Sequence, residues 1–319
     1  MLYRILHPAS RAVRPLFIRD LRVHGSELLS ERGPIILAAN HPNSFLDAIL
    51  LCSLFDHPVT SLTRGDVFRS GWAKRILHLL HMRPVYRVRE GAENLGENYA
   101  TFQQCETILG NKGIVLIFSE GSCFNEWKLR PLRKGTARLA FQCWHAGIPV
   151  RVVPTAINYS SFRSWGKQVH IHFSKPITLA DLPTNVSEGT AYQALNQQLL
   201  QALAETVYQA PDKTALDSAG YFSPKRNWKE PMTFLLLPLS CIAVVLHAPL
   251  YALIHYFGLR WVKDNDHADS IMVALGYILY PIYWCLLIGL AYIFLPAYTW
   301  IGMSILSPLS IRAWLLAHR

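Results

Sequence analysis

Two long uncharged apolar runs in the last third of the chain constrain its fold more than any other feature. Met232–Phe257 contains no Asp, Glu, Lys or Arg, and neither does Ile271–Ile311 over its 41 residues. An α-helix rises about 1.5 Å per residue, so about 20 such residues cross the hydrocarbon core of a bilayer. We therefore predict a transmembrane region of two or three helices over residues 232–319. The alternative is a buried helical hairpin in a soluble protein, which runs of this length disfavour.

The part of the chain before these runs is basic, and apolar residues stand between its charges. The formal net charge of the chain is +10, which requires an anionic partner, either nucleic acid or an anionic membrane surface. Arginines interspersed with apolar residues in the first 32 positions favour the membrane surface. They are Arg4, Arg11, Arg14, Arg19, Arg22 and Arg32. We expect Leu2–Leu21 to form an amphipathic helix on the membrane, interrupted at Pro8 and Pro15.

A polar segment, residues 219–231, separates the two parts and is predicted to be a linker. Its basic residues Lys225, Arg226 and Lys229 come directly before the first apolar run. Cytoplasmic segments next to membrane spans are enriched in Lys and Arg. We therefore expect an integral membrane protein whose residues 1–218 lie on the cytoplasmic face of the membrane.

Apolar runs alternate with helical patterns across residues 1–218, which is typical of an α/β sheet with helices packed around it. The predicted strands are Ile35–Ala39, Val59–Thr63, Met82–Arg87, Gly113–Phe118, Val150–Asn158 and Val169–Phe173. The predicted helices are Phe45–Leu54, Ser70–Leu80, Glu93–Leu109, Thr136–Ala146 and Thr190–Tyr208. The cysteines form no C-x-x-C pair and no Cys/His group with zinc spacing, so we expect no bound metal.

His41 and Asp47 lie where the first predicted strand turns into a helix. Within one helix, six steps of about 100° would place their side chains about 120° apart. Pro42 and the good N-cap residues Asn43 and Ser44 instead put His41 in the turn and Asp47 in the first helical turn. The carboxylate can then bind one ring nitrogen and make the other a better base for a hydroxyl proton. A capping box between Ser44 and Asp47 is the purely structural alternative.

Two further polar clusters follow predicted strands. The stretch RGDVFR begins at Arg64, and PVYR ends at Arg87. Arginines at strand ends suit a phosphate group, which they can bind through two hydrogen bonds. The stretch FSEGSCFNEW delivers Glu120 and Gly121 at the end of a buried strand. The glycine permits a tight turn close to a ligand, and the glutamate can bind a substrate hydroxyl or orient an arginine.

Positive charge and a proline-containing strand complete the pattern. Arg130, Arg133 and Lys134 come just before a helix start at Gly135, which also favours an anion. The later stretch VVPTAI places Pro154 near the middle of a predicted strand. Because proline lacks an N–H group, we expect this strand to lie at an edge or to bulge beside a cavity.

Taken in order, these clusters resemble the four sequence blocks of the glycerolipid acyltransferase family, which includes lysophosphatidate and glycerol-3-phosphate acyltransferases. Those blocks are a His and an Asp separated by four residues, an arginine block, Glu-Gly-Thr-Arg, and a hydrophobic strand with a proline. Here they read HPNSFLD, RGDVFR with PVYR, FSEGSCFNEW and VVPTAI, within residues 30–180. The resemblance implies an acyltransferase domain over residues 1–218, with a mixed α/β sheet surrounded by helices.

The chain departs from the family pattern at two places. Five residues separate His41 from Asp47, a spacing that occurs in a branch resembling fungal glycerol-3-phosphate acyltransferases, which also carry C-terminal membrane spans. Glu-Gly-Ser-Cys replaces Glu-Gly-Thr-Arg, so that Cys123 stands where the family has arginine. Ser122 can replace the threonine hydroxyl, and Arg130 or Lys134 would supply the missing charge.

The resemblance implies direct transfer of a fatty acyl group from acyl-CoA or acyl-carrier protein, without another cofactor, to the hydroxyl of lysophosphatidate. The product would be phosphatidate, made in phospholipid biosynthesis. His41, oriented by Asp47, would take the proton of the acceptor hydroxyl, and no acyl-enzyme on Cys123 is expected. The implied substrate-binding residues are Asn40, Arg64, Arg87, Glu120, Gly121, Ser122, Arg130, Lys134 and Pro154.

Other acceptors and one other class of protein stay open. Glycerol-3-phosphate or a lyso-aminolipid is the alternative acceptor. The implied partners are membrane lipids and the acyl donor, not nucleic acid. A membrane-anchored lipid-binding protein without activity is the alternative of a different class. That alternative predicts loss of His41, Asp47 or Glu120, and the chain has all three.

Overall fold

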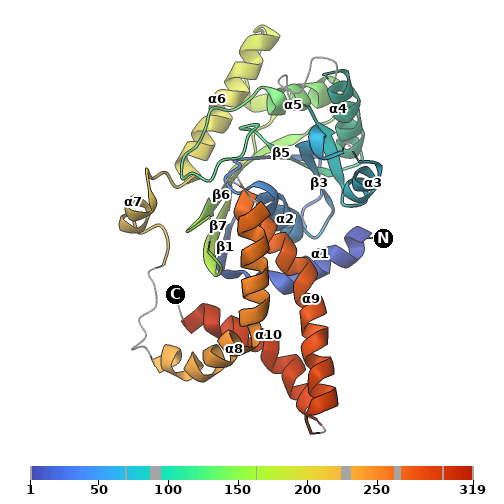
Figure 1. The fold of residues 1–319 in the computed structure, drawn as a ribbon. Helices are drawn as coiled ribbons and strands as arrows, with labels where there is room; N and C mark the ends of the chain where they lie inside the picture. The colour runs from blue at the N-terminus through green and yellow to red at the C-terminus, as the bar shows by residue number, and fades with distance from the viewer. Residues whose placement is uncertain are drawn as a thin grey trace.

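Seven strands of the described chain form one sheet, in the order β1-β7-β6-β2-β5-β3-β4 (Figure 1). The computed structural model describes residues 2–68, 70–86, 95–162, 164–223, 231–261, 267–296 and 298–317. Only β6 and β7 pair antiparallel, and the other pairings between these strands are parallel, which confirms the predicted mixed sheet. The strands are β1 (Ile18–His24), β2 (Ile35–Ala39), β3 (Val59–Arg64), β4 (Met82–Val85), β5 (Ile114–Phe118), β6 (Arg151–Tyr159) and β7 (Lys167–Phe173).

The central strands are apolar on both faces because helices cover both sides of the sheet. In β2, Ile35 and Leu37 belong to one hydrophobic core, and Ile36 and Ala38 to the other. All four are completely buried. Alternate residues of a strand point to opposite faces, so a strand buried on both faces reads as a continuous apolar run.

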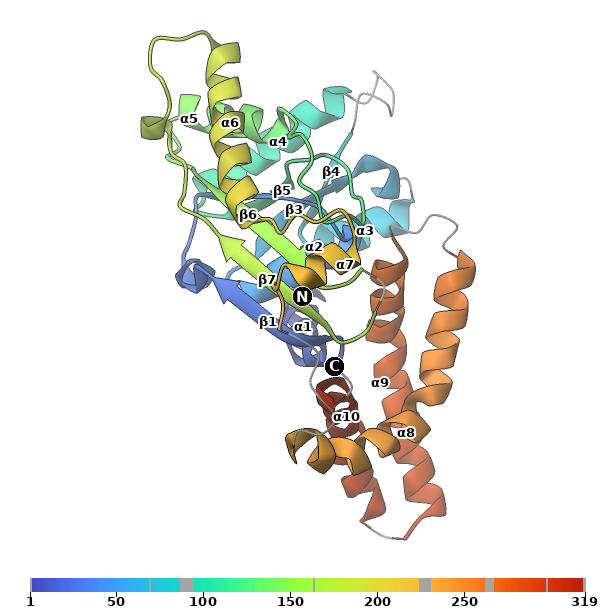
Figure 2. The same ribbon diagram turned by 90° about the vertical axis from the view of Figure 1, so that its left-hand side faces the viewer.

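Helices form a layer on each face of the sheet (Figures 1 and 2). One layer contains α4 (Leu95–Gly110), α5 (Gly135–His145) and α6 (Glu188–Thr206), whose apolar sides share a core with Ile36. The other contains α1 (Leu2–Val13) and α2 (Ser44–Leu54), which pack against the face of Ile35. Two shorter helices are α3 (Gly71–Leu79) and α7 (Lys213–Ser218). The strands and helices predicted in residues 35–208 differ from these bounds by no more than two residues.

The prediction of one helix over Leu2–Leu21 is wrong beyond Val13. A 3₁₀ turn follows α1, and Ile18–His24 then forms β1, which pairs parallel with β7. The break comes where Pro15 removes a backbone donor, whereas Pro8 is accommodated inside α1. α1 also contacts the protein directly, because the Arg11 guanidinium donates to the carbonyls of Ser53, Leu54 and Phe55 at the end of α2, at 2.6, 2.7 and 3.0 Å.

Three C-terminal helices are long and apolar enough to cross a membrane. They are α8 (Pro231–Trp261), α9 (Ala268–Phe294) and α10 (Thr299–Ala317). In their most apolar stretches, only 22%, 17% and 28% of the residues are buried inside the protein. Such exposed apolar surface argues against a buried hairpin in a soluble protein. Residues 224–230, which make up most of the predicted linker and include its basic residues, lie outside the described residues, so the domain boundary stays a prediction.

Candidate active site

His41 and Asp47 meet at the carboxyl end of β2. The chain leaves the sheet after Ala39, makes a turn over residues His41–Ser44, here called the His41 turn, and begins α2 at Ser44. Nδ1 of His41 lies 2.9 Å from Oδ2 of Asp47. The helix starts where the N-cap pattern predicts, and this start brings the carboxylate back to the imidazole.

The Asp47 carboxylate is completely buried and has three hydrogen-bond partners. Besides His41, the Asn43 N–H donates to Oδ2 at 2.8 Å, and the Tyr159 hydroxyl donates to Oδ1 at 2.7 Å. Burial, and then the neighbouring carboxylate, raise the pKa of Tyr159 well above its ordinary value, so its hydroxyl stays a donor. Because an ionised carboxylate only accepts, Nδ1 of His41 is the donor in this contact, which leaves Nε2 as the ring nitrogen that can act as a base.

Phe118 and Glu120 hold the ring and the backbone of His41, respectively. The ring stacks on Phe118 at the end of β5, with 3.8 Å between ring centroids and 15° between ring planes. The Glu120 carboxylate accepts from the backbone N–H of His41 at 3.2 Å and from that of Arg130 at 3.1 Å. Burial raises the pKa of Glu120, and these two N–H groups oppose that shift. Glu120 therefore joins the His41 turn to the loop that follows β5 through these two hydrogen bonds.

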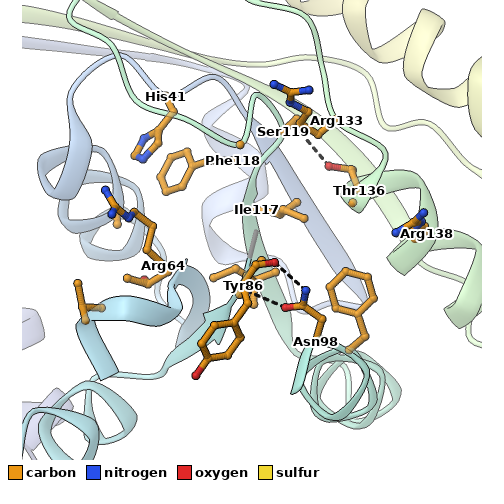
Figure 3. A pocket seen from close by; sticks show the side chains of 18 of the residues that line it. His41, Arg64, Tyr86, Asn98, Ile117, Phe118, Ser119, Arg133, Thr136 and Arg138 are labelled. Carbon is orange, nitrogen blue, oxygen red and sulfur yellow. Dashed lines mark hydrogen bonds between the residues drawn. The ribbon is translucent and has the colours of Figure 1, made fainter. Parts of the chain in front are cut away.

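A cavity of about 1580 Å³ borders His41. Strands β2, β3 and β5 are mutually parallel, so their carboxyl ends meet at one edge of the sheet and open this space. Arg64, at the end of β3, lines one side, and Arg133 and Arg138 line another. Figure 3 shows Arg64 and the Arg133–Arg138 pair on opposite sides of the view, with Phe118 and Ile117 between them. The cavity therefore has arginines on two sides of one imidazole, and Arg64 is ion-paired with Asp66, which also lines the cavity.

A third side of the cavity is apolar and includes a helix that is long enough to cross a membrane. Phe45 and Ala48 of α2 and Ile271 and Ala274 of α9 line it. Val273 of α9 also belongs to the core that α2 shares with the sheet. The apolar side of the cavity thus continues along the first turns of α9.

Some of the predicted binding residues line the cavity and others do not. Arg64 and Gly121 do, and Gly121 has the positive φ of 67° that its turn requires. Arg87 lies outside the described residues. The predicted residues that are not among those lining the cavity are Asn40, Glu120, Ser122, Arg130, Lys134 and Pro154.

Several of these residues have structural partners instead. The Asn40 side chain exchanges two hydrogen bonds with the backbone of Ile157, at 3.1 and 2.8 Å. The Arg130 guanidinium binds both carboxylate oxygens of Glu126, at 2.8 and 2.9 Å, and lies over the Phe124 ring. Arg133 and Arg138, and not Arg130 or Lys134, are the basic residues of this part of the chain that line the cavity.

The expectation that Pro154 marks a sheet edge is wrong, and Pro154 is not among the residues that line the cavity. Its strand, β6, lies between β2 and β7, and Pro154 is buried opposite Ala38 of β2. The continuous antiparallel pairing with β7 begins only at the next residue, Thr155, so the missing N–H does not interrupt that ladder. The Pro154 carbonyl accepts from the N–H of Ser174 at 2.9 Å.

Three features of the site were not predicted from the sequence. Tyr159 ends a strand that reads as an ordinary apolar run. Arg138 lies one helical turn after Lys134 on α5, and that spacing was the available signal. Asp269, at the start of α9, accepts a hydrogen bond from the Asn43 side chain of the His41 turn. The two residues are 226 positions apart, so no local sequence pattern predicts their contact.

Comparisons with known proteins found a matching family model and similar solved structures. Residues 20–158 match the family model described as Acyltransferase, within the range where the sequence predicts an acyltransferase domain. No curated protein matches the chain. Among solved structures, it is similar to the crystal structure of the 1-acyl-sn-glycerophosphate (LPA) acyltransferase PlsC from Thermotoga maritima. That similarity has 18% identity and a TM-score of 0.45, covering 68% of this chain and 78% of that chain.

Proposed function

We propose that this protein is a membrane-bound O-acyltransferase that moves a fatty acyl group from an acyl thioester to the free hydroxyl of lysophosphatidate. The observation that carries the proposal is the His41–Asp47 pair beside a cavity with arginines on two sides and an apolar third side. The family match supplies the reaction class. Helices α8, α9 and α10 supply the means of reaching lipid substrates.

The proposed reaction begins with proton transfer. Nε2 of His41 takes the proton of the acceptor hydroxyl, and the buried Asp47 stabilises the imidazolium that forms. The hydroxyl oxygen attacks the thioester carbonyl carbon and forms a tetrahedral intermediate. When that intermediate collapses, the C–S bond breaks, the ester remains, and the leaving thiolate takes the proton back from His41. No acyl group is transferred to the protein in this sequence.

The arrangement of charge around the cavity suits the two substrates. Arg64 would bind the phosphate of the acceptor, and Arg133 with Arg138 would bind the phosphate-bearing handle of acyl-CoA or acyl-carrier protein. The fatty chain would lie along Phe45 and Ala274, where apolar contact releases water. A lysophospholipid carries both a phosphate and an apolar chain, which favours it over glycerol-3-phosphate as the acceptor.

An acceptor panel tests the proposal. Detergent-purified protein would receive labelled acyl-CoA or acyl-carrier protein with lysophosphatidate, glycerol-3-phosphate or a lyso-aminolipid. We expect acylation of lysophosphatidate that is lost in His41→Ala and kept in His57→Ala, which changes a histidine in the loop between α2 and β3, away from the residues that line the cavity. Acylation of another acceptor would correct the substrate. No acylation of any acceptor by folded protein would contradict the proposal and favour a lipid-binding role.

A further inference from the structure

The first turn of α9 is hydrogen-bonded to the His41 turn. The Asn43 side-chain amide donates to Oδ2 of Asp269 at 2.7 Å. The Ser270 hydroxyl donates to the Asn43 carbonyl at 3.0 Å and accepts from the Leu46 N–H at 3.1 Å. Nδ1 of His267 lies 2.8 Å from the hydroxyl oxygen of Ser44. A helix of the membrane region therefore contacts the segment that carries the proposed general base.

Asp269 also forms an ion pair with Lys167, the first residue of β7, inside the protein. The two side chains are only 4% and 3% exposed. Removing two charges from water costs free energy that their attraction often fails to recover. Such a pair therefore often adds little to the stability of the fold. Buried, hydrogen-bonded pairs are better at fixing one arrangement of the groups around them.

Asn43 connects this ion pair to the His41–Asp47 pair. Its backbone N–H donates to Oδ2 of Asp47, the same oxygen that faces His41, while its side chain donates to Asp269. One residue therefore spans two buried carboxylates. A displacement of the Asn43 side chain would move the N–H that orients Asp47, and tenths of an ångström matter in such a site.

We propose that Asp269 is a positioning residue, which holds Asn43, and through it Asp47 and His41, in the geometry that proton transfer requires. Lys167 fixes the Asp269 carboxylate. The proposal rests on the acyl transfer proposed above, and it makes α9 a component of the active site as well as a membrane helix. Its rival is that the contact only joins α9 to the rest of the fold.

Two neutral double variants separate these roles, and neither leaves a buried unpaired charge. Lys167→Gln with Asp269→Asn keeps an acceptor for Asn43 and replaces the ion pair by an amide pair. Lys167→Met with Asp269→Leu is apolar and offers no acceptor to Asn43. Replacing a buried ion pair by apolar residues is often neutral for stability, so we expect both variants to fold.

The experiment measures kcat, KM for the acyl donor, and thermal unfolding for both variants and the wild type. We expect the Gln/Asn variant to keep kcat within about threefold, and the Met/Leu variant to lose about tenfold or more in kcat at unchanged KM. Adding Asn43→Ala to the Met/Leu variant should cause little further loss. Equal kcat in both double variants, or a loss that only follows the folded fraction, would overturn the proposal.

A second measurement tests the proposal without depending on turnover. Diethyl pyrocarbonate modifies neutral imidazole, and peptide mass spectrometry follows the modification of His41. We expect an unchanged rate in the Gln/Asn variant and a faster rate in the Met/Leu variant, where the His41 turn is less constrained. Equal rates would contradict the positioning role. If the wild type acylates no acceptor while the rates differ as expected, the proposed function fails and the positioning of His41 stands.

Discussion

At the scale of single residues, the site depends on how completely the Asp47 carboxylate is hydrogen-bonded. Three donors fix a side chain that has no contact with solvent, so Asp47 holds one orientation towards His41. The His41–Asp47 contact was predictable, because the two residues lie within one turn and helix start. Tyr159 was not, because its hydroxyl reaches Asp47 from a strand 112 positions away.

The Tyr159 hydroxyl provides a direct test at this scale. Tyr159→Phe removes the 2.7 Å hydrogen bond to Oδ1 of Asp47 and leaves the ring in place. A hydrogen bond to a buried charged group contributes about 1.5–3 kcal/mol, so we expect kcat to fall about 10- to 100-fold. Steady-state kinetics would check this, with Tyr221→Phe, a partly exposed tyrosine, as the control. An unchanged kcat would show that Asp47 needs only His41 and Asn43.

The arginines on two sides of the cavity predict a crossed effect on the two substrates. Arg64→Ala should raise KM for lysophosphatidate about tenfold, and Arg138→Ala should raise KM for acyl-CoA by a similar factor, because each loses a charge-assisted bond to phosphate. Titration of each substrate at saturating concentrations of the other measures both constants. The opposite pairing, or equal effects on both substrates, would contradict the proposed assignment.

At the scale of elements, α2 and α9 together define the apolar side of the cavity. α2 was predictable from its own apolar pattern, and so was the apolar character of α9. Their contact was not, because a uniformly apolar helix does not indicate which face packs on which neighbour. β1 was missed for a related reason: it is an edge strand rich in arginine, and only its pairing with β7 identifies it.

A larger side chain on α9 should shorten the acyl chain that the enzyme accepts. Ala274 lines the cavity, and Ala274→Phe would fill part of it. We expect kcat/KM to fall for long acyl chains and to stay near the wild-type value for short ones, measured with an acyl-CoA series. Ile278→Phe, at a position 63% exposed on the same helix, is the matched control. A uniform loss for all chain lengths would contradict a chain-binding role for α9.

Two histidines on β7, the strand beside the edge strand β1, predict how stability depends on pH. Burial is the main cause that lowers the pKa of His170 and of His172 to about 4, below the ordinary value of 6.5. Between about pH 4 and 6.5 the unfolded chain therefore binds more protons, so the free energy of unfolding rises with pH. This contribution is complete above pH 6.5 and is lost as the pH falls towards 4.

Thermal unfolding in detergent checks this dependence. We expect a lower Tm at pH 5 than at pH 7.5, and a smaller difference in His172→Gln, which removes one of the two groups. His57→Gln, outside this cluster, should retain the wild-type difference. A Tm that is equal at the two pH values would contradict the account of these buried imidazoles.

At the scale of the whole molecule, the chain combines a domain that matches the Acyltransferase family model with three helices that are long and apolar enough to cross a membrane. Both parts were predictable, because an α/β pattern and long uncharged runs are strong local signals. The interface between them was not predictable, because no local sequence pattern relates Asp269 to Asn43. That interface places the start of α9 beside His41, where a lipid substrate leaving the bilayer would meet the proposed base.

The measurement that tests the central claim most directly is a single-turnover acyl transfer with intact-protein mass analysis. Wild type and His41→Ala, matched for folded protein, would react with labelled acyl-CoA and lysophosphatidate. If His41 is the general base for direct transfer, the variant loses on the order of 10³-fold in rate, and neither protein carries an acyl adduct. Turnover that survives His41→Ala, or an acyl group found on Cys123, would contradict the account.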